Sequence, residues 1–156
     1  MAGMDYEIEV KDLPAQPAVA IRDTVATNGL GPAMRELYPV VGAFLEKRGI
    51  EPTGPSFAVY HSFSEEEVEF EAGFPLPEPV EGEGRVVGIE LPAVRAAVTV
   101  HVGPYTTIGQ AHEALDAWAH GQGHDHGEPV REIYLVGPGQ DDDSTNWRTE
   151  VVYPLA

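Results

Sequence analysis

Apolar residues alternate with polar ones in some segments of the chain and recur every three or four residues in others. Alternation with a period of two is typical of a strand with one buried face, and the wider spacing is typical of an amphipathic helix. The wider spacing predicts two helices, one at residues 31–48 and one from about residue 106 to 121. The alternating pattern predicts strands at residues 6–10, 18–22, 57–61, 67–74, 86–91, 94–102, 132–136 and 147–154.

Both predicted helices carry signals for where they begin, bend or end. Pro39 lies inside the first one, where proline removes a backbone hydrogen bond and costs about 3 kcal/mol in a straight helix. We therefore expect a kink or a restart there, and we expect Gly49 to end the helix. Thr106 or Thr107 is expected to cap the second helix. Its apolar stripe ends in Trp118, which we expect in the core.

The order strand–helix–strand–strand occurs twice, and short sequence signals recur with it. Leu-Pro-Ala at residues 13–15 returns at 91–93, and Phe-Pro-Leu at 74–76 is matched by Tyr-Pro-Leu at 153–155. The sequence predicts one α+β domain over residues 1–156, duplicated about a pseudo-twofold axis, with halves at about 5–77 and 85–155. Residues 75–84 form the expected linker. Because each half has a single helix, we expect an antiparallel sheet with both helices on one face and a ligand cleft on the other, at the seam between halves.

Composition narrows the classes of function. The 156 residues include 9 Lys and Arg against 26 Asp and Glu, a formal net charge of −17. Such a chain is a poor partner for nucleic acid or for anionic membranes, because both are bound through basic residues. It has no cysteine, which excludes disulfides, thiol catalysis and cysteine-ligated metals. No secretion signal or membrane span is apparent, so we expect a cytoplasmic protein.

One acidic residue lies in an unusual place for its type. Glu132 begins an otherwise apolar strand, and a period of two puts Tyr134 on its face and Ile133 with Leu135 on the other. If the helices cover Ile133 and Leu135, Glu132 and Tyr134 face the cleft. Superposing the loops before the two matching strands places Tyr60 on Tyr134. A carboxylate among tyrosines suits an organic cation, whereas the alternative is a glutamate on a solvated sheet face.

Other candidates are aromatic residues and histidines. Trp147 and Tyr153 share the last strand, where Trp147 is either a lid over the ligand or a cover for strand ends. Tyr38 is either directed into the seam or part of the surface or core. His61 and His101 lie on or beside strands and are weaker candidates for the pocket border. The histidines at positions 120, 124 and 126 lie in a glycine-rich loop without the spacing of a zinc site, so we expect no metal and no cofactor.

The ordered set of motifs resembles a known family. The set comprises Leu-Pro-Ala at 91–93, His-Val-Gly-Pro-Tyr at 101–105, Pro-Val-Arg-Glu-Ile-Tyr-Leu at 129–135 and Trp-Arg-Thr-Glu at 147–150. It resembles the GyrI-like small-molecule-binding domain, which also serves as the effector-binding domain of AraC-type and MerR-type transcription activators. The resemblance covers nearly the whole chain. It implies an aromatic pocket between the halves whose floor is a glutamate that attracts cationic amphiphiles, and the matching position is Glu132.

The resemblance favours a free-standing domain that binds hydrophobic, often cationic, small molecules. The expected ligand-binding residues are Glu132, Tyr134, Tyr60, Trp147, Tyr38 and Tyr153. The alternative is a hydrolase in which Glu132 is a general base assisted by Tyr134 or Tyr60. An interaction with DNA gyrase, as in one bacterial member of the family, is a third and weaker hypothesis. The chain has no room for a helix-turn-helix, so we expect no direct contact with nucleic acid.

Overall fold

The computed structural model describes residues 6–124, 129–138 and 140–155, which form two compact units. One unit comprises Met1–Leu13 with Val94–Ala156, and the other comprises Pro14–Ala93. The described residues contain two α-helices and eight strands, and every strand pairing within the units is antiparallel. The predicted α+β class is therefore confirmed.

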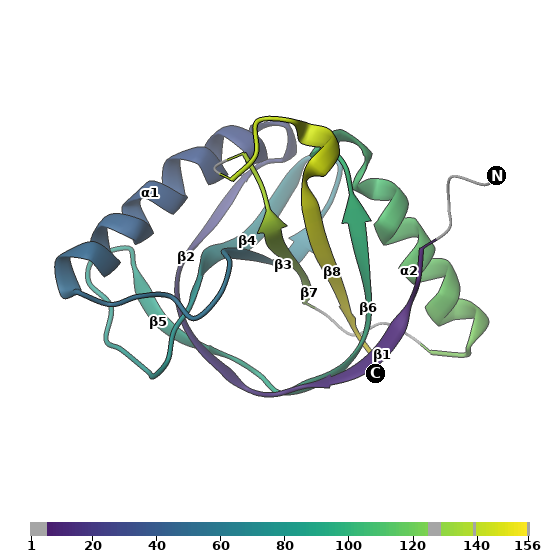
Figure 1. Cartoon of the computed structure of the whole chain (residues 1–156), viewed down its shortest axis with the longest axis horizontal. Coiled ribbons are helices and arrows are strands. Elements are labelled where there is room, and N and C mark those ends of the chain that lie inside the picture. The colour runs from purple at the N-terminus through teal and green to yellow at the C-terminus, as the bar shows by residue number, and fades with distance from the viewer. Residues whose placement is uncertain (1–5, 125–128, 139, 156) are drawn as a thin grey trace. The chain divides into compact units, whose positions relative to one another are not determined.

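In the Pro14–Ala93 unit, one helix packs on a four-stranded sheet of order β3-β4-β2-β5. The helix α1 lies along β2 and β4 and buries its apolar stripe, including Leu37 and Val41, against Val19 and Phe70 of these strands (Figure 1). The elements are α1 (Leu30–Arg48), β2 (Gln16–Ala26), β3 (Phe57–Phe63), β4 (Glu67–Pro75), β5 (Val87–Leu91) and the short turn η2 (Thr27–Gly29).

The second unit repeats this plan with its strands in the order β1-β6-β8-β7. The helix α2 packs along β6 and β8 (Figure 1), and its residues Ala111 and Leu115 are fully buried against Val151 and Tyr153. The elements are β1 (Glu9–Leu13), β6 (Val94–Val102), α2 (Gly109–Gly121), β7 (Val130–Val136), β8 (Arg148–Pro154) and the short turns η3 (Tyr105–Thr107) and η4 (Ser144–Asn146).

The strand order of the two units fits the duplication seen in the sequence. When the order β5-β2-β4-β3 of one unit is aligned with β1-β6-β8-β7 of the other, each strand of the first sequence half is matched to its counterpart in the second half. The matched strands are β1 with β5, β2 with β6, β3 with β7 and β4 with β8. The first strand of each half is exchanged, because β1 pairs with β6 and β5 pairs with β2. Both Leu-Pro-Ala motifs lie at the boundaries between units, after Leu13 and around Ala93, so they mark where the chain passes from one unit to the other.

At helix α1 the structure excludes a restart at Pro39 and confirms the role of Gly49. The helix runs through Pro39 without a restart, because Leu37 and Val41 on either side are fully buried and hold the stripe in register. Gly49 ends it in the left-handed conformation, as expected, at φ +67°. The expected linker at 75–84 instead packs within one unit. Its Leu76 is 1% exposed, and the Leu76 carbonyl accepts a hydrogen bond from the Gln16 amide.

The predicted cap of α2 is also wrong. The residue before the helix is Ile108, and neither threonine side chain caps it. The Thr107 hydroxyl donates instead to the carbonyl of Pro104 and lies 3.0 Å from Nε2 of His101. This hydroxyl therefore stabilises the turn η3, which precedes the helix.

Candidate functional site

Glu132 lies on the face of its sheet that carries the helix. In the register of β7 and β8, Glu132 is opposite Val151 and Tyr134 is opposite Thr149. Directly opposed residues of antiparallel strands share a face, and Val151 belongs to the cluster buried by α2. The expectation that Glu132 and Tyr134 point away from the helices is therefore wrong in this unit.

The sequence prediction placed Ile133 and Leu135, the apolar side of β7, on the sheet face covered by the helix. Ile133 does pack against apolar residues, but these are Ala96, Val98 and Val152 on the other face of the sheet. Leu135 lies at an irregularity in the pairing of β7 with β8 and is 39% exposed. Because both faces of the sheet bury apolar side chains here, alternation alone could not tell which face the helix covers.

The Glu132 carboxylate is held by two polar side chains from different elements. The Tyr134 hydroxyl donates to Oε1 at 2.8 Å, and Nε2 of His112 on α2 lies 2.7 Å from Oε2. Glu132 itself is 7% exposed. The other ring nitrogen of His112, Nδ1, lies 3.2 Å from the Tyr153 hydroxyl. The described contacts thus join a strand carboxylate, a helix imidazole and two phenols on the α2 face.

Two further aromatic rings extend this cluster, and one of them was not predicted. The ring of Tyr105 in η3 meets Tyr134 edge to face at 5.7 Å between centroids and lies 5.0 Å from the ring of Trp147. Trp147 is fixed by its indole N–H, which donates to the carbonyl of Asp141 at 2.8 Å. We call Glu132, Tyr134, Tyr153, Tyr105, Trp147 and His112 the carboxylate–aromatic cluster.

The turn after β6 places Tyr105 in this cluster. Gly103 has φ +129°, a conformation that other residues rarely adopt, and its N–H donates to the carbonyl of Trp147 at 2.8 Å. Pro104 then leads directly into η3. The His-Val-Gly-Pro-Tyr motif therefore builds the turn that carries Tyr105 towards Tyr134 and Trp147.

A buried polar row lies beside the cluster on the same face. Thr149 is opposite both His101 and Tyr134 and is fully buried, and its hydroxyl has no hydrogen-bond partner among the described residues. His101 is 3% exposed and contacts the hydroxyls of Tyr6 at 2.9 Å and Thr107 at 3.0 Å. His101 is thus a buried structural histidine that links Tyr6, which precedes β1, to η3.

Burial and negative charge perturb two of the phenols. Burial raises the pKa of Tyr153 to about 12, and the charges of Asp116 and Glu132 add to the effect. Burial, followed by the charge of Glu132, also raises the pKa of Tyr105. Both hydroxyls therefore stay neutral at physiological pH, so they can donate hydrogen bonds without adding negative charge.

The remaining predicted residues belong to the Pro14–Ala93 unit. Tyr38 on α1 donates its hydroxyl to the carbonyl of Phe57 at 2.6 Å and meets Phe74 edge to face. Tyr60 packs against the core under α1 and contacts the ring of Phe63. His61 bonds to the carboxylate of Glu71. Within each unit the structure thus groups Glu132, Tyr134, Tyr153 and Trp147 together, and it gives Tyr38 and Tyr60 surroundings of their own.

The loop histidines have no metal-like arrangement in the part of the chain that is described. His124 stacks on Trp118, with ring centroids 6.3 Å apart and planes at 19°, while His126 lies outside the described residues. Trp118 packs against the α2 core, as predicted. No group of three or more His, Cys, Asp or Glu side chains that could hold a metal occurs among the described residues.

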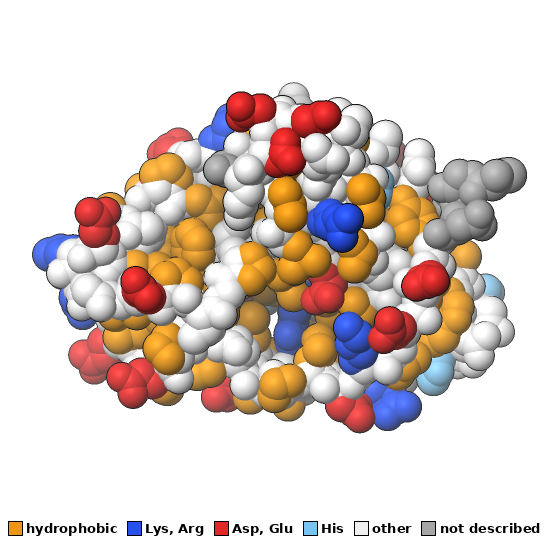
Figure 2. All heavy atoms as spheres, in the orientation of Figure 1, with side chains coloured by type: hydrophobic (Ala, Val, Ile, Leu, Met, Phe, Trp, Pro, Cys, Tyr) orange, Lys and Arg blue, Asp and Glu red, His pale blue; other side chains and the backbone are white. Residues whose placement is uncertain are grey.

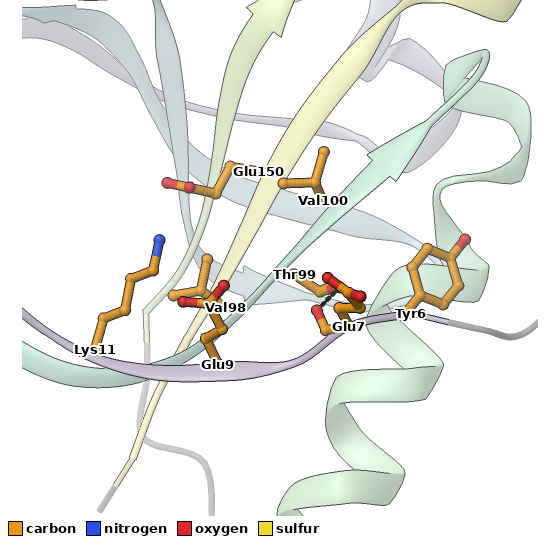
Figure 3. Close-up of a pocket in the computed structure, with 8 residues that line it drawn as sticks. All are labelled: Tyr6, Glu7, Glu9, Lys11, Val98, Thr99, Val100 and Glu150. Atoms are coloured by element: carbon orange, nitrogen blue, oxygen red, sulfur yellow. Dashed lines mark hydrogen bonds between the residues drawn. The ribbon is translucent and has the colours of Figure 1, made fainter.

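A cavity of about 260 Å³ lies on the other face of the β1-β6-β8 sheet. Its lining includes Val98, Val100 and Glu150, and Figure 3 shows the Lys11 amino group directed towards the Glu150 carboxylate. Tyr6 is its single aromatic lining residue, and Lys11 offsets part of its acidic charge. Three glutamates and one lysine leave the lining of this cavity negatively charged, but its single aromatic ring gives it far less aromatic surface than the carboxylate–aromatic cluster has.

Acidic side chains are spread over the face of the molecule shown in Figure 2. Figure 2 shows acidic side chains at many separate places on the visible face, with no single acidic patch. Within the described residues, no helix is both long and apolar enough to span a bilayer.

The sequence and the fold were compared with known proteins. The family model of the GyrI-like small-molecule-binding domain matches residues 6–156. No curated protein sequence matches the chain. The crystal structure of the EcmrR C-terminal domain is similar, with 24% identity and a TM-score of 0.87 over 97% of this chain and 98% of that one. In the complex of EcmrR with DNA, identity is 25% and the TM-score 0.86, and the match covers 97% of this chain but spans 58% of the EcmrR chain.

More distant structures share the fold. SAV2435, solved bound to tetraphenylphosphonium, is 13% identical with a TM-score of 0.71, covering 96% of this chain and 94% of that one. A hydrolase encoded by lin2189 from Listeria innocua is 12% identical with a TM-score of 0.70, covering 96% and 92%. The EcmrR C-terminal domain, a protein bound to tetraphenylphosphonium and a hydrolase thus have this fold in common.

Proposed function

The chain belongs to the family of GyrI-like small-molecule-binding domains, and from this premise we propose that it captures lipophilic organic cations at the carboxylate–aromatic cluster. The observation that carries the proposal is the position of Glu132. Its carboxylate is nearly buried, and phenol and indole rings of the same unit lie around it. A negative charge in such a partly desolvated setting attracts a cation more strongly than a solvated carboxylate does.

The aromatic rings supply the second part of the recognition. A cation over the face of tyrosine or tryptophan gains about 0.5–2 kcal/mol, depending on how far it is desolvated. Tyr105 is 37% exposed and stands next to Trp147, so these two rings are the accessible edge of the cluster. Supporting this choice of ligand class, the related SAV2435 has been solved with tetraphenylphosphonium, a cation made of four aromatic rings.

The test makes the same substitution, Glu to Gln, once on each face of the sheet. Replacing Glu132 by Gln keeps the size and hydrogen-bonding capacity of the side chain but removes its charge. We expect tetraphenylphosphonium affinity, measured by isothermal titration calorimetry, to fall by roughly 10- to 100-fold, which corresponds to about 1.4–2.8 kcal/mol. Glu150→Gln is the matched control, because it removes the same charge from the neighbouring strand on the other face.

The two variants separate the possible locations of the site. Full affinity in Glu150→Gln with reduced affinity in Glu132→Gln supports the proposal, provided both variants unfold at wild-type denaturant concentrations. Reduced affinity in Glu150→Gln alone would place the cation in the cavity of Figure 3 and contradict the proposal.

Hydrolysis is the second candidate, favoured by the pairing of His112 with Glu132. An imidazole beside a carboxylate can transfer protons during attack by water. However, both Glu132 oxygens already contact His112 and Tyr134, so a water molecule would have to displace one of these contacts to give its proton to the carboxylate. We therefore favour binding. Mass spectrometry of the ligand after incubation separates the two, because a binder returns it unchanged and a hydrolase does not.

A further inference from the structure

We propose that His112 is a built-in counter-ion of the site, so that a proton on its imidazole and an organic cation compete for the Glu132 carboxylate. This inference rests on the proposed capture of cations and adds its regulation by pH. It starts from the contact between His112 Nε2 and Glu132 Oε2, which are 2.7 Å apart and belong to a helix and a strand. The His112 side chain is 25% exposed, so protons can reach it from solvent.

The neighbours of His112 can form hydrogen bonds with the neutral and with the protonated imidazole in the same ring position. In the neutral ring, Nε2–H donates to Glu132 and Nδ1 accepts from the Tyr153 hydroxyl, 3.2 Å away. In the charged ring both nitrogens donate, and the Tyr153 oxygen accepts after its hydroxyl hydrogen rotates. Protonation therefore changes the charge of the site without requiring the imidazole to move.

The groups that face this imidazole carry negative charge or none. Glu132 comes from β7 and the neutral Tyr153 from β8, while Asp116 lies one turn further along α2 and is close enough to act on Tyr153. Tyr105 in η3 is within electrostatic reach of Glu132. On β6, the buried His101 is a second titratable group on this face, and it bonds to Tyr6 and Thr107.

The charge balance of the pair determines what the site attracts. With His112 neutral, the pair carries one negative charge and attracts an external cation. With His112 protonated, the imidazolium and the carboxylate cancel, so a cation must displace the proton or bind without charge compensation. Histidine is the side chain that most readily changes its charge near neutral pH, so the competition can be tested by varying the pH.

By linkage, a cation that binds the neutral state better releases a proton, and its affinity rises with pH. For a single competing proton, affinity changes by at most about tenfold per pH unit on the acidic side of the titration. A neutral aromatic molecule of similar shape does not compete with the proton. The site therefore selects cations at high pH and loses this preference at low pH.

The experiment measures tetraphenylphosphonium affinity and proton release by calorimetry at about pH 5.5, 6.5, 7.5 and 8.5, a range that spans the titration of histidine. At each pH, two buffers of different ionisation enthalpy give the number of protons released. We expect the wild type to bind the cation more tightly as pH rises. At the lowest pH values it should release a fraction of a proton for each cation bound. His112→Gln keeps an amide donor near Glu132 but does not titrate, so its affinity should not change with pH. His120→Gln, an exposed histidine on the same helix, should keep the wild-type profile.

Each outcome decides the matter. If the wild type binds the cation with constant affinity and no proton release, the inference fails while cation capture stands. If His112→Gln keeps the wild-type slope, another group such as His101 is responsible and the inference is wrong. If tetraphenylphosphonium does not bind at any pH, the proposed function and the inference fail together. Should His112→Gln not fold, proton release in Glu132→Gln decides: its loss supports the inference, because no carboxylate is left to compete for, and wild-type release would assign the proton to another group. Triphenylphosphine oxide is the neutral probe that should release none.

Discussion

The Tyr153 hydroxyl can hold the His112 imidazole in place whether or not that imidazole is charged. It lies 3.2 Å from Nδ1 of His112, and burial raises its pKa to about 12, with contributions from Asp116 and Glu132. The phenol therefore remains neutral wherever His112 changes its charge. A neutral hydroxyl can donate or accept, which allows it to hold the imidazole in either protonation state.

The raised pKa of Tyr153 predicts a loss of stability at alkaline pH. The unfolded tyrosine titrates near pH 10 and the folded one near 12, so the phenol's contribution is intact below pH 10 and is lost as pH rises from about 10 to 12. We expect Tyr153 to account for about 2–3 kcal/mol of unfolding free energy over this window. Urea unfolding at several alkaline pH values should show a steeper decline in the wild type than in Tyr153→Phe. Equal slopes would mean that Tyr153 titrates normally.

Sequence reasoning found Glu132, Tyr134, Tyr153 and Trp147 of the carboxylate–aromatic cluster but not His112 or Tyr105. Glu132 and Tyr134 could be found because a carboxylate in an apolar strand is conspicuous and its neighbours follow from the strand period. His112 was missed, although it lies four residues after Ile108 and three before Leu115, on the edge of the apolar stripe. A histidine at such a position suits core or solvent equally well. Its partner depends on which sheet face the helix covers, and the sequence did not reveal that face.

Among the elements, the turn between β6 and α2 controls the aromatic part of the site. Gly103 adopts φ +129° there and links to the backbone of Trp147, and the following turn η3 carries Tyr105. A side chain at position 103 would strain the backbone and shift both aromatic residues. The site's aromatic surface therefore depends on a glycine that does not itself touch the carboxylate.

We predict that Gly103→Ala both destabilises the fold and weakens cation binding. Adopting this backbone conformation with a Cβ costs about 1–3 kcal/mol, which should appear in urea unfolding. Gly42→Ala is the matched control, because that glycine lies inside α1 with nothing within 4 Å of an added Cβ. Alanine there should be neutral or stabilising by up to about 1 kcal/mol. Wild-type stability and affinity in Gly103→Ala would show that the turn is not constrained as described.

The positions of helices and strands could be predicted much better than their mutual packing. The strand β6 was predicted with its observed ends, and Gly49 with its role, because both follow from local patterns. A restart at Pro39 was one of two expectations and does not occur, because buried neighbours on the same helix outweigh a missing hydrogen bond. The exchange of β1 and β5 between the units could not be predicted either. A strand's own sequence specifies its faces but not its partner.

On the scale of the whole molecule, the net charge of −17 and the single carboxylate at position 132 act over different distances. The carboxylates on the face shown in Figure 2 are dispersed, so we expect them to create a diffuse field that raises the local concentration of cations and speeds association. Salt screens that field, since the Debye length is about 10 Å at 0.1 M. The Glu132 carboxylate is nearly buried, so salt should weaken its attraction for a bound cation far less.

We therefore predict that salt and Glu132 affect separate parts of the binding reaction. Raising NaCl from about 20 to 500 mM should slow tetraphenylphosphonium association roughly two- to tenfold and change dissociation little. Stopped-flow fluorescence of Trp147 can follow both rates, with triphenylphosphine oxide as the neutral probe whose rates should not depend on salt. Glu132→Gln should speed dissociation at every salt concentration and keep the salt dependence of association. If that variant instead loses the salt dependence, the field arises mainly from Glu132, and the dispersed carboxylates contribute nothing to capture.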